Sequence, residues 1–141
     1  MTLRKTAFAF GLIFTLLLSA CGQQGGAAPA ADLTGQWTLT TLYGQEPLSD
    51  TTITANFENG EIGGQAGCNS YGGQYSTAGQ SLSISTLVQT EMACLNPAGV
   101  MDQESTYLKT LPQAASFSIN GDQLEIQNAA GETILTFTKT Q

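Results

Sequence analysis

A glycine-rich segment, residues 63–75, is the feature that most restricts how this chain can fold. Ile62, Gly64, Ala66 and Cys68 alternate with other residues, which is the period of a β-strand. Small residues on one face of a strand let a sheet bend sharply or let another element approach closely. The segment has no Gly-Lys-Ser/Thr sequence and no helical pattern directly after it, so it is not a typical phosphate-binding loop. It predicts a strongly curved β-sheet.

The same alternation of apolar and polar residues continues through most of the chain after residue 33. Turn sequences such as Asn59-Gly60 and Asn120-Gly121 separate the predicted strands, as in antiparallel hairpins. The residues expected to face inward include Trp37, Leu39, Thr41, Tyr43, Ile53, Ala55, Phe57, Leu82, Ile84, Phe117, Ile119, Leu124, Ile126 and Phe137. About eight short strands at this spacing predict a mainly β fold. We expect a curled antiparallel sheet that closes toward a small barrel, with one α-helix packed on it.

One helical pattern interrupts the strands. Asn96 is expected to cap the helix, Pro97 suits its first turn and Pro112 ends it. The side chains that share one face at helical spacing are Val100, Glu104, Tyr107, Leu108 and Leu111. We expect this face to cover the open side or mouth of the sheet.

Glu104 is the one acidic residue within that apolar face. The favoured interpretation is a carboxylate at the helix edge that reaches water or backbone amides, since most carboxylates are solvated. The alternative is a buried and protonated carboxyl group. The sequence leaves both open.

Residues 1–20 have the pattern of a signal peptide, with Arg4 and Lys5 followed by an apolar run of 12 residues, 7–18. That run is shorter than the roughly 20 residues that span a bilayer. It ends in Leu18-Ser19-Ala20-Cys21, which resembles a bacterial lipobox, so we expect Cys21 to be lipidated. The alternatives are a membrane anchor helix, or a secreted protein with Cys21 as a free thiol. Gly22 in place of aspartate indicates the outer membrane if the bacterium has two membranes.

Residues 21–32 are predicted to be the lipidated cysteine and a flexible tether, because they are small, polar and unpatterned. Residues 33–141 are predicted to form one domain. Without Arg4 and Lys5, two lysines face eleven acidic residues, a formal side-chain charge of −9. Phosphate backbones and anionic lipid surfaces repel such a domain. We therefore expect no nucleic-acid partner, membrane contact through the lipid on Cys21 alone, and a monomer.

Cys68 and Cys94 are the two cysteines of the predicted domain. In an exported protein, such a pair favours a disulfide, here between the glycine-rich bend and the entrance of the helix. Two buried free thiols are the main alternative. A metal site is disfavoured because the chain has no histidine and the domain no third thiol.

Several motifs together resemble the META domain, the family of the heat-shock lipoprotein HslJ. The motif positions are Gly67, Cys68, Asn69, Tyr71, Thr90, Met92, Cys94 and Glu104. The resemblance covers residues 33 to about 139. It implies a small β-barrel-like fold with one helix, often on a bacterial lipoprotein. It also implies an association with heat-shock response and antibiotic tolerance, and no established catalytic activity.

We therefore expect a lipid-anchored, non-enzymatic envelope protein that supports envelope stress resistance or antibiotic tolerance through an unidentified envelope protein or a small ligand. No cofactor or metal is expected. One alternative is a carrier that holds a small apolar ligand in the barrel interior. Another is an enzyme that uses Glu91 and Glu104 as an acid–base pair on glycans. The lack of histidine and of any pattern that brings the two carboxylates together disfavours the enzyme.

Overall fold

The computed structural model describes residues 32–140. The predicted signal peptide, the lipidation site Cys21 and nearly all of the tether lie outside the described residues. The elements follow in the order β1 (Gly35–Leu42), β2 (Thr54–Glu58), β3 (Glu61–Gln65), β4 (Ser70–Ala78), β5 (Ser81–Ile84), β6 (Val88–Gln89), α1 (Val100–Thr110), the 3₁₀-helix η1 (Leu111–Gln113), β7 (Ser116–Asn120), β8 (Gln123–Gln127) and β9 (Thr133–Lys139). The predicted mainly β fold with one α-helix is confirmed.

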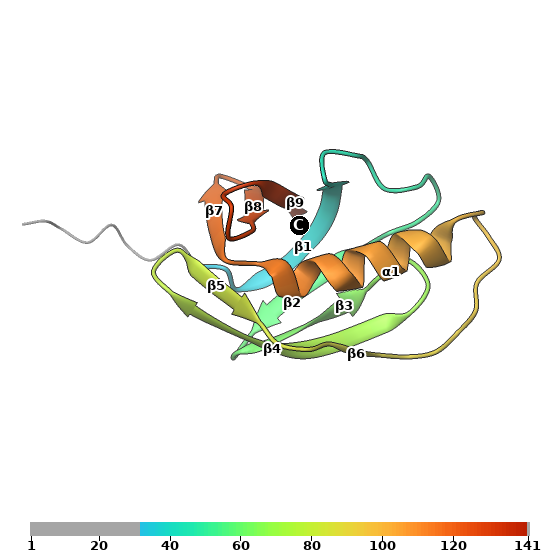
Figure 1. The fold of residues 1–141 in the computed structure, drawn as a ribbon, viewed down its shortest axis with the longest axis horizontal. Helices are drawn as coiled ribbons and strands as arrows, with labels where there is room; N and C mark the ends of the chain where they lie inside the picture. The colour runs from blue at the N-terminus through green and yellow to red at the C-terminus, as the bar shows by residue number, and fades with distance from the viewer. Residues whose placement is uncertain (1–31, 141) are drawn as a thin grey trace, which may run out of the picture.

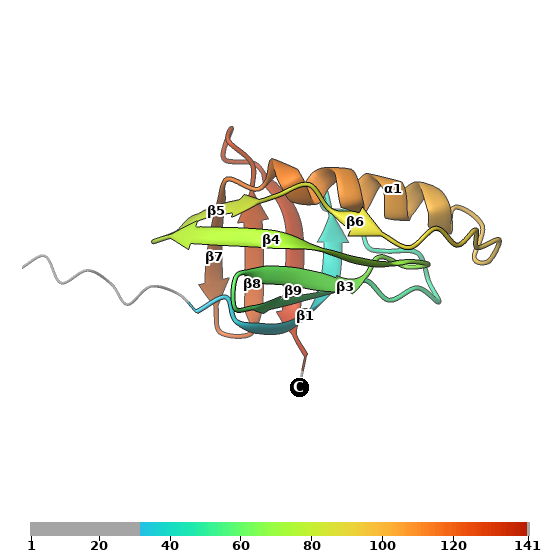
Figure 2. The same ribbon diagram turned by 90° about the horizontal axis from the view of Figure 1, so that it is seen from below.

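The sheet is antiparallel and closes on itself. Its order is β3-β2-β1-β9-β8-β7-β5-β4-β6, and β3 also pairs with β4, so eight strands form a ring and β6 lies outside it (Figure 1). In Figure 2, α1 lies across the ends of the strands β1, β8 and β9, as expected for a helix that covers the mouth of the ring.

The ring is joined unevenly. The pairing of β3 with β4 spans five residue pairs, whereas β5 and β7 share the single pair Ser81↔Ser116. Two further backbone hydrogen bonds flank that pair, from Leu82 to Ala115 and from Phe117 to Gln80. The seam between β5 and β7 is therefore the thinnest junction of the ring.

The inward-facing residues are as predicted for most strands. Trp37, Ile53, Phe57, Leu124 and Phe137 are all fully buried, together with most of the other residues expected inside. Their side chains fill the interior of the ring. The alternation therefore identified the core correctly wherever the strands are regular.

The end of β1 departs from the expected alternation. The register with β9 shifts between Leu39 and Thr41, so a bulge interrupts the period of two. Thr41 is only half-buried, and Tyr43 is 48% exposed in a turn after the strand, with φ of 50°. The expectation that both residues face the core is wrong, because the extra residue of the bulge turns their side chains out of line.

The glycine-rich segment bends where the sequence suggests. The strand breaks at residues 66–69, between the end of β3 and the start of β4. A Cβ at Gly64 would collide with the carbonyl oxygen of Thr54 and lie 2.8 Å from its carbonyl carbon. Gly67 has φ of 114°, and a Cβ there would lie 3.4 Å from Cγ2 of Val100. The glycines thus allow close approach of the neighbouring strand and of helix α1.

Helix α1 begins later than predicted. Its N-cap is Gly99, with φ of 89°, and the N–H of Val100 donates to the carbonyl of Pro97. Asn96 and Pro97 therefore belong to the connection before the helix, because the left-handed Gly99 prevents a helix from running through them. At the other end, α1 stops at Thr110, and Pro112 lies in the 3₁₀-helix that follows.

Candidate functional site

The structure confirms the disulfide between Cys68 and Cys94. The two Cα atoms are 6.0 Å apart, and the cysteines are 26 positions apart in sequence. Cys68 lies in the turn at residues 66–69, and Cys94 lies in the connection from β6 to α1. Closing a loop of this length stabilises the fold by about 3–4 kcal/mol in the chain-entropy picture.

Glu104 lies directly behind the same turn. It is 1% exposed, and its Oε2 accepts the backbone N–H groups of Cys68, at 3.0 Å, and Asn69, at 2.6 Å. Its Oε1 accepts the side-chain Nδ2 of Asn69 at 2.7 Å. Both sequence interpretations hold in part, because the group reaches backbone amides, as one expected, and is buried, as the other expected. All three partners are donors, which suits a carboxylate that only accepts.

Asn69 connects this carboxylate to the segment after β6. Its Oδ1 accepts the hydroxyl of Thr90, at 2.8 Å, and the backbone N–H of Met92, at 2.7 Å. Its Nδ2 donates to the carbonyl of Met92, at 3.0 Å, as well as to Glu104. The amide of Asn69 therefore pairs with the backbone of Met92 as a neighbouring strand would. The motif positions Asn69, Thr90, Met92 and Glu104 meet in one hydrogen-bonded cluster.

Tyr71 extends the cluster into the core. Its hydroxyl donates to the carbonyl of Thr54, at 2.9 Å, and lies 2.7 Å from the hydroxyl of Tyr107. Because Tyr71 has a single hydroxyl proton, Tyr107 must donate to Tyr71. Burial raises the pKa of the Tyr71 phenol well above its usual value. Burial also raises the pKa of Tyr107, and the neighbouring Tyr71 raises it further.

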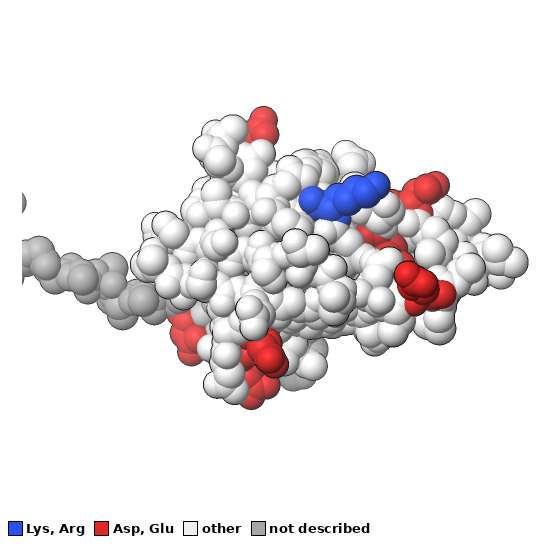
Figure 3. Space-filling view, turned by 60° about the horizontal axis from the view of Figure 1, so that its bottom comes forward, with Lys and Arg blue, Asp and Glu red and all other residues white. Residues whose placement is uncertain are grey.

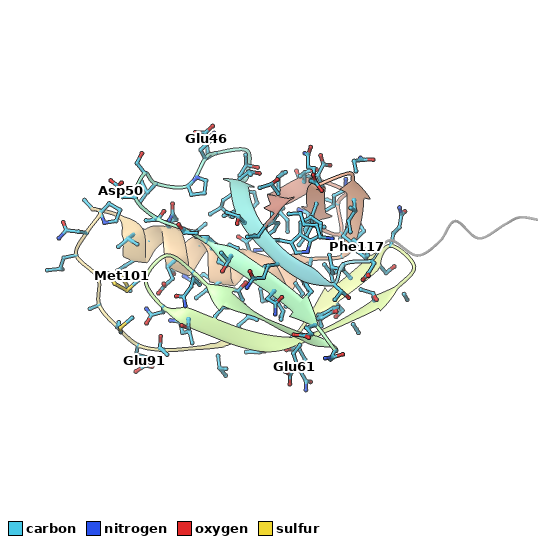
Figure 4. The ribbon with its side chains drawn as sticks, turned by 180° about the vertical axis from the view of Figure 1, so that it is seen from behind. Glu46, Asp50, Glu61, Glu91, Met101 and Phe117 are labelled. Carbon is cyan, nitrogen blue, oxygen red and sulfur yellow. A yellow bond between two sulfur atoms is a disulfide. The ribbon has the colours of Figure 1, made fainter. Side chains whose placement is uncertain are left out.

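The structure does not bring Glu91 and Glu104 together as an acid–base pair. Glu91 is exposed, and Figure 4 shows it at the outer edge of the molecule, whereas Glu104 is buried against the turn at residues 66–69. A groove that Glu104 lines does not include Glu91. Within residues 32–140, no three histidine, cysteine, aspartate or glutamate side chains gather as a metal site would require.

Sequence reasoning missed several exposed apolar side chains between β6 and the first turn of α1. Leu95 is 84% exposed, Val88 73%, Met92 57% and Met101 36%. These residues lie on β6, on the connection after it and on the first turn of α1. Their only sequence signal is a group of apolar residues without strand or helix period.

Two grooves adjoin helix α1. The first, of about 430 Å³, lies between the segment of β6 and the helix, and its lining includes Leu87, Gln89, Met101 and Leu108. The second, of about 390 Å³, lies between the helix and the loop after β1, with Leu42 and Leu48 among its lining residues. A third groove, of about 710 Å³, is lined mainly by polar residues of β2, β3 and β4.

No helix in the part of the chain from 32 to 140 combines the length and the apolar character needed to cross a membrane.

Three solved structures resemble this one in fold. A protein from Burkholderia xenovorans, solved by NMR, has a TM-score of 0.60 and 25% identity, and covers 76% of this chain and 82% of its own. A second NMR structure has a TM-score of 0.59 and 23% identity, with 74% and 88% covered. The crystal structure of a DUF4847 family protein from Bacteroides vulgatus has a TM-score of 0.54 and 12% identity, with 77% and 95% covered.

Among curated proteins, nothing matches this chain. A family comparison does, and it assigns residues 31–141 to the META domain. The match covers the whole folded region, including the disulfide and the cluster around Glu104 and Asn69. The chain therefore belongs to the META domain family.

Proposed function

We propose that this protein is a lipid-anchored, non-enzymatic module of the bacterial cell envelope, which binds a partner there and supports envelope stress resistance or antibiotic tolerance. Removal of residues 1–20 would leave Cys21 as the lipidated N-terminus, and residues 22–32 would hold the domain off the membrane. The lipobox sequence and membership of the META domain family support this proposal. Gly22 favours the outer membrane in a bacterium with two membranes.

The proposal that the protein is not an enzyme rests on the hydrogen bonds of its buried polar side chains. Glu104 and Asn69 are both 1% exposed, and their side chains bond to the turn at residues 66–69 and to the segment 90–92. A general acid or base needs a proton-transfer position that a substrate can reach. The contacts of these two residues instead fix one loop against the ring and against α1, which is a structural task.

The proposal that the protein binds a partner rests on exposed apolar side chains in the segment after β6. The cluster holds Met92, and the disulfide holds Cys94 next to Leu95, so these two apolar side chains stay at the surface with exposed fractions of 57% and 84%. The alternative of a ligand carrier with an internal cavity has no such support. Fully buried side chains, among them Trp37 and Phe57, fill the ring.

The test is survival of a deletion strain under heat and antibiotic challenge, with complementation by three versions of the gene. We expect deletion to reduce survival and the wild type to restore it. Cys21→Ala should not restore it, and should lose incorporation of a palmitate analogue. Glu91→Gln should restore it fully, since that carboxylate is exposed and unused in the cluster. Survival that does not change on deletion would refute the stress role, and palmitate labelling of Cys21→Ala would refute the anchor.

A further inference from the structure

We propose that the groove between β6 and helix α1 binds an extended peptide segment of a partner protein, which adds to the sheet as a further strand beside β6. This inference rests on the proposed binding role and names its site and the kind of partner. Strand addition of this type supplies affinity through backbone hydrogen bonds and selectivity through pockets for alternate side chains.

The backbone of β6 has one paired side and one open side. β6 pairs with β4 through Gly72↔Val88 and Tyr71↔Gln89, and the N–H of Thr90 donates to the carbonyl of Ser70. In an antiparallel ladder, the N–H and C=O groups of successive residues point to opposite sides. Because Val88 and Thr90 face β4, the N–H and C=O of Gln89 face away from it.

Other pairings of β4 agree with this alternation. The N–H of Ser85 donates to the carbonyl of Gln74, so the even-numbered residues of β4 bond on the side of β5 and β6. The N–H of Tyr75 donates to Gly60, so odd-numbered residues bond toward β3. Within residues 32–140, β6 has no strand on its other side. An open strand edge of this kind is a template for another chain.

A groove runs along that open edge. One wall is formed by Leu87 and Gln89, and the other by Met101, Ser105 and Leu108 of helix α1. Its volume of about 430 Å³ and its mostly apolar lining suit the side chains of an extended segment. A cleft between a strand edge and a helix offers a peptide both ladder partners and a hydrophobic wall.

The charged residues in the lining of the groove indicate which kind of peptide it would bind. Lys109 lines the groove, whereas the carboxylate of Glu104 in the same lining is already bonded to three N–H donors. On the face shown in Figure 3, acidic side chains are spread over the surface and a lysine is the basic group among them. We infer a segment with apolar residues at alternate positions and a carboxylate that pairs with Lys109.

Two occupants from this protein itself fit less well. Residues 22–31 contain no apolar residue larger than alanine or proline, so this segment could not fill a groove lined by leucine and methionine. The described chain also begins at the end of the molecule opposite to Glu91 and Met101 (Figures 1 and 4). In a second copy, the β6 strand is flanked by β4 on one side and by α1 across the groove, so it cannot enter this cleft.

The test is selection of random octapeptides displayed on phage against the full chain in detergent, followed by titration of single enriched peptides. Gln89→Pro removes the N–H that faces the groove and leaves the ladder to β4 intact. We expect Gln89→Pro to bind the enriched peptides about tenfold more weakly, the effect of one lost backbone hydrogen bond. The matched comparison is Gln89→Ala, which removes the same side chain but keeps the backbone N–H, so it should bind the peptides about tenfold more tightly than Gln89→Pro.

Two further measurements keep the test independent of any effect of proline on folding. Ser105→Trp should block the groove from the helix side and abolish binding, with an unchanged melting temperature. In the wild type, hydrogen exchange of the Gln89 amide should slow when a peptide binds. Failure to enrich any peptide would overturn the inference. Binding by Gln89→Pro and Ser105→Trp that is as tight as binding by the wild type would also overturn it.

These outcomes are distinct from those of the proposed function. Peptide binding without a survival defect in the deletion strain would leave the groove in place and remove the stress role. A survival defect with no selectable peptide would support the stress role and refute the peptide-binding groove.

Discussion

At the scale of single residues, this protein uses two polar side chains in place of strand pairing. Asn69 bonds to both backbone groups of Met92, and Glu104 accepts both backbone N–H groups of the turn at Cys68 and Asn69. Such backbone groups are costly to bury without partners. The two side chains therefore allow an irregular turn and an irregular connection to pack against the core.

Glu104→Gln tests this role. Oε2 receives two backbone N–H groups, so the glutamine oxygen must take that position and its NH₂ must face the NH₂ of Asn69. Asn69 cannot turn over, because its Oδ1 accepts from Thr90 and Met92. We expect a loss of about 2–3 kcal/mol in the free energy of unfolding, measured by urea denaturation. Glu91→Gln in the neighbouring exposed segment should change it by less than about 0.5 kcal/mol.

The hydroxyl pair of Tyr71 and Tyr107 predicts a loss of stability at alkaline pH. Burial raises the pKa of both phenols in the folded state, while the unfolded chain keeps the ordinary value of 10.0. Above that value the unfolded state gives up protons that the folded state retains, so the free energy of unfolding falls as pH rises. Below it the contribution is fully present.

Urea denaturation at a series of pH values measures this effect. The slope of stability against pH should be clearly negative above the ordinary phenol pKa, and shallower in Tyr71→Phe than in the wild type. An identical slope in the two proteins would show that the Tyr71 phenol ionises as easily in the folded state as in the unfolded chain.

At the scale of the elements, regular segments could be predicted and irregular ones could not. The period of two identified most inward residues of the strands, and the two cysteines identified the disulfide. The bulge that turns Thr41 and Tyr43 outward could not be predicted from the alternation of apolar and polar residues, because it depends on the register with β9. The helix start was misplaced because Pro97 is typical of a first turn, whereas the left-handed Gly99 delays the helix.

The candidate site was predictable in its members and not in its arrangement. The motif positions were identified through the resemblance to the META domain, but the contacts of Asn69 with Met92 and Glu104 join residues far apart in sequence. The groove beside β6 was not predictable, because a strand of two residues leaves almost no periodic signal.

A pair of glycine substitutions tests how the curved strands approach one another. A Cβ at Gly64 would collide with the backbone of Thr54, so Gly64→Ala must push β2 and β3 apart. We expect it to lower the free energy of unfolding by about 2–3 kcal/mol. In the adjacent strand, a Cβ at Gly72 would make an ordinary 3.7 Å contact with the carbonyl oxygen of Ile62.

Gly72→Ala is therefore the matched control. It should leave stability unchanged or raise it by up to about 1 kcal/mol, because alanine restricts the unfolded chain. Thermal denaturation of the two variants beside the wild type makes the comparison. Equal losses in both would mean that any side chain on this hairpin is harmful, rather than the close approach at Gly64.

At the scale of the whole molecule, the start of the described chain and the disulfide lie far apart. The described chain begins at one end, next to the predicted tether, and the disulfide-bound connection lies at the other (Figure 1). Leu95, 84% exposed, lies in that connection, directly after Cys94. Under the proposed lipid anchor on Cys21, this arrangement would place Leu95 on the side of the domain that faces away from the membrane.

Under the proposed export and lipidation, the charge of residues 21–141 predicts how the protein behaves without its lipid. With two lysines against eleven acidic residues, the Cys21→Ala protein should not co-sediment with vesicles rich in anionic lipid, even at low salt. The lipidated wild type should partition fully into the same vesicles, because two or more acyl chains give stable anchoring. Co-sedimentation of Cys21→Ala would reveal a second membrane-binding element.

The seam between β5 and β7 sets where this ring first gives way. A single residue pair closes it, while every neighbouring junction within the ring holds several. Local unfolding should therefore begin at this junction and open the ring into a sheet with two free edges. Residues 80–82 and 115–117 are then the hinge of partial unfolding, and the place from which two copies could exchange strands.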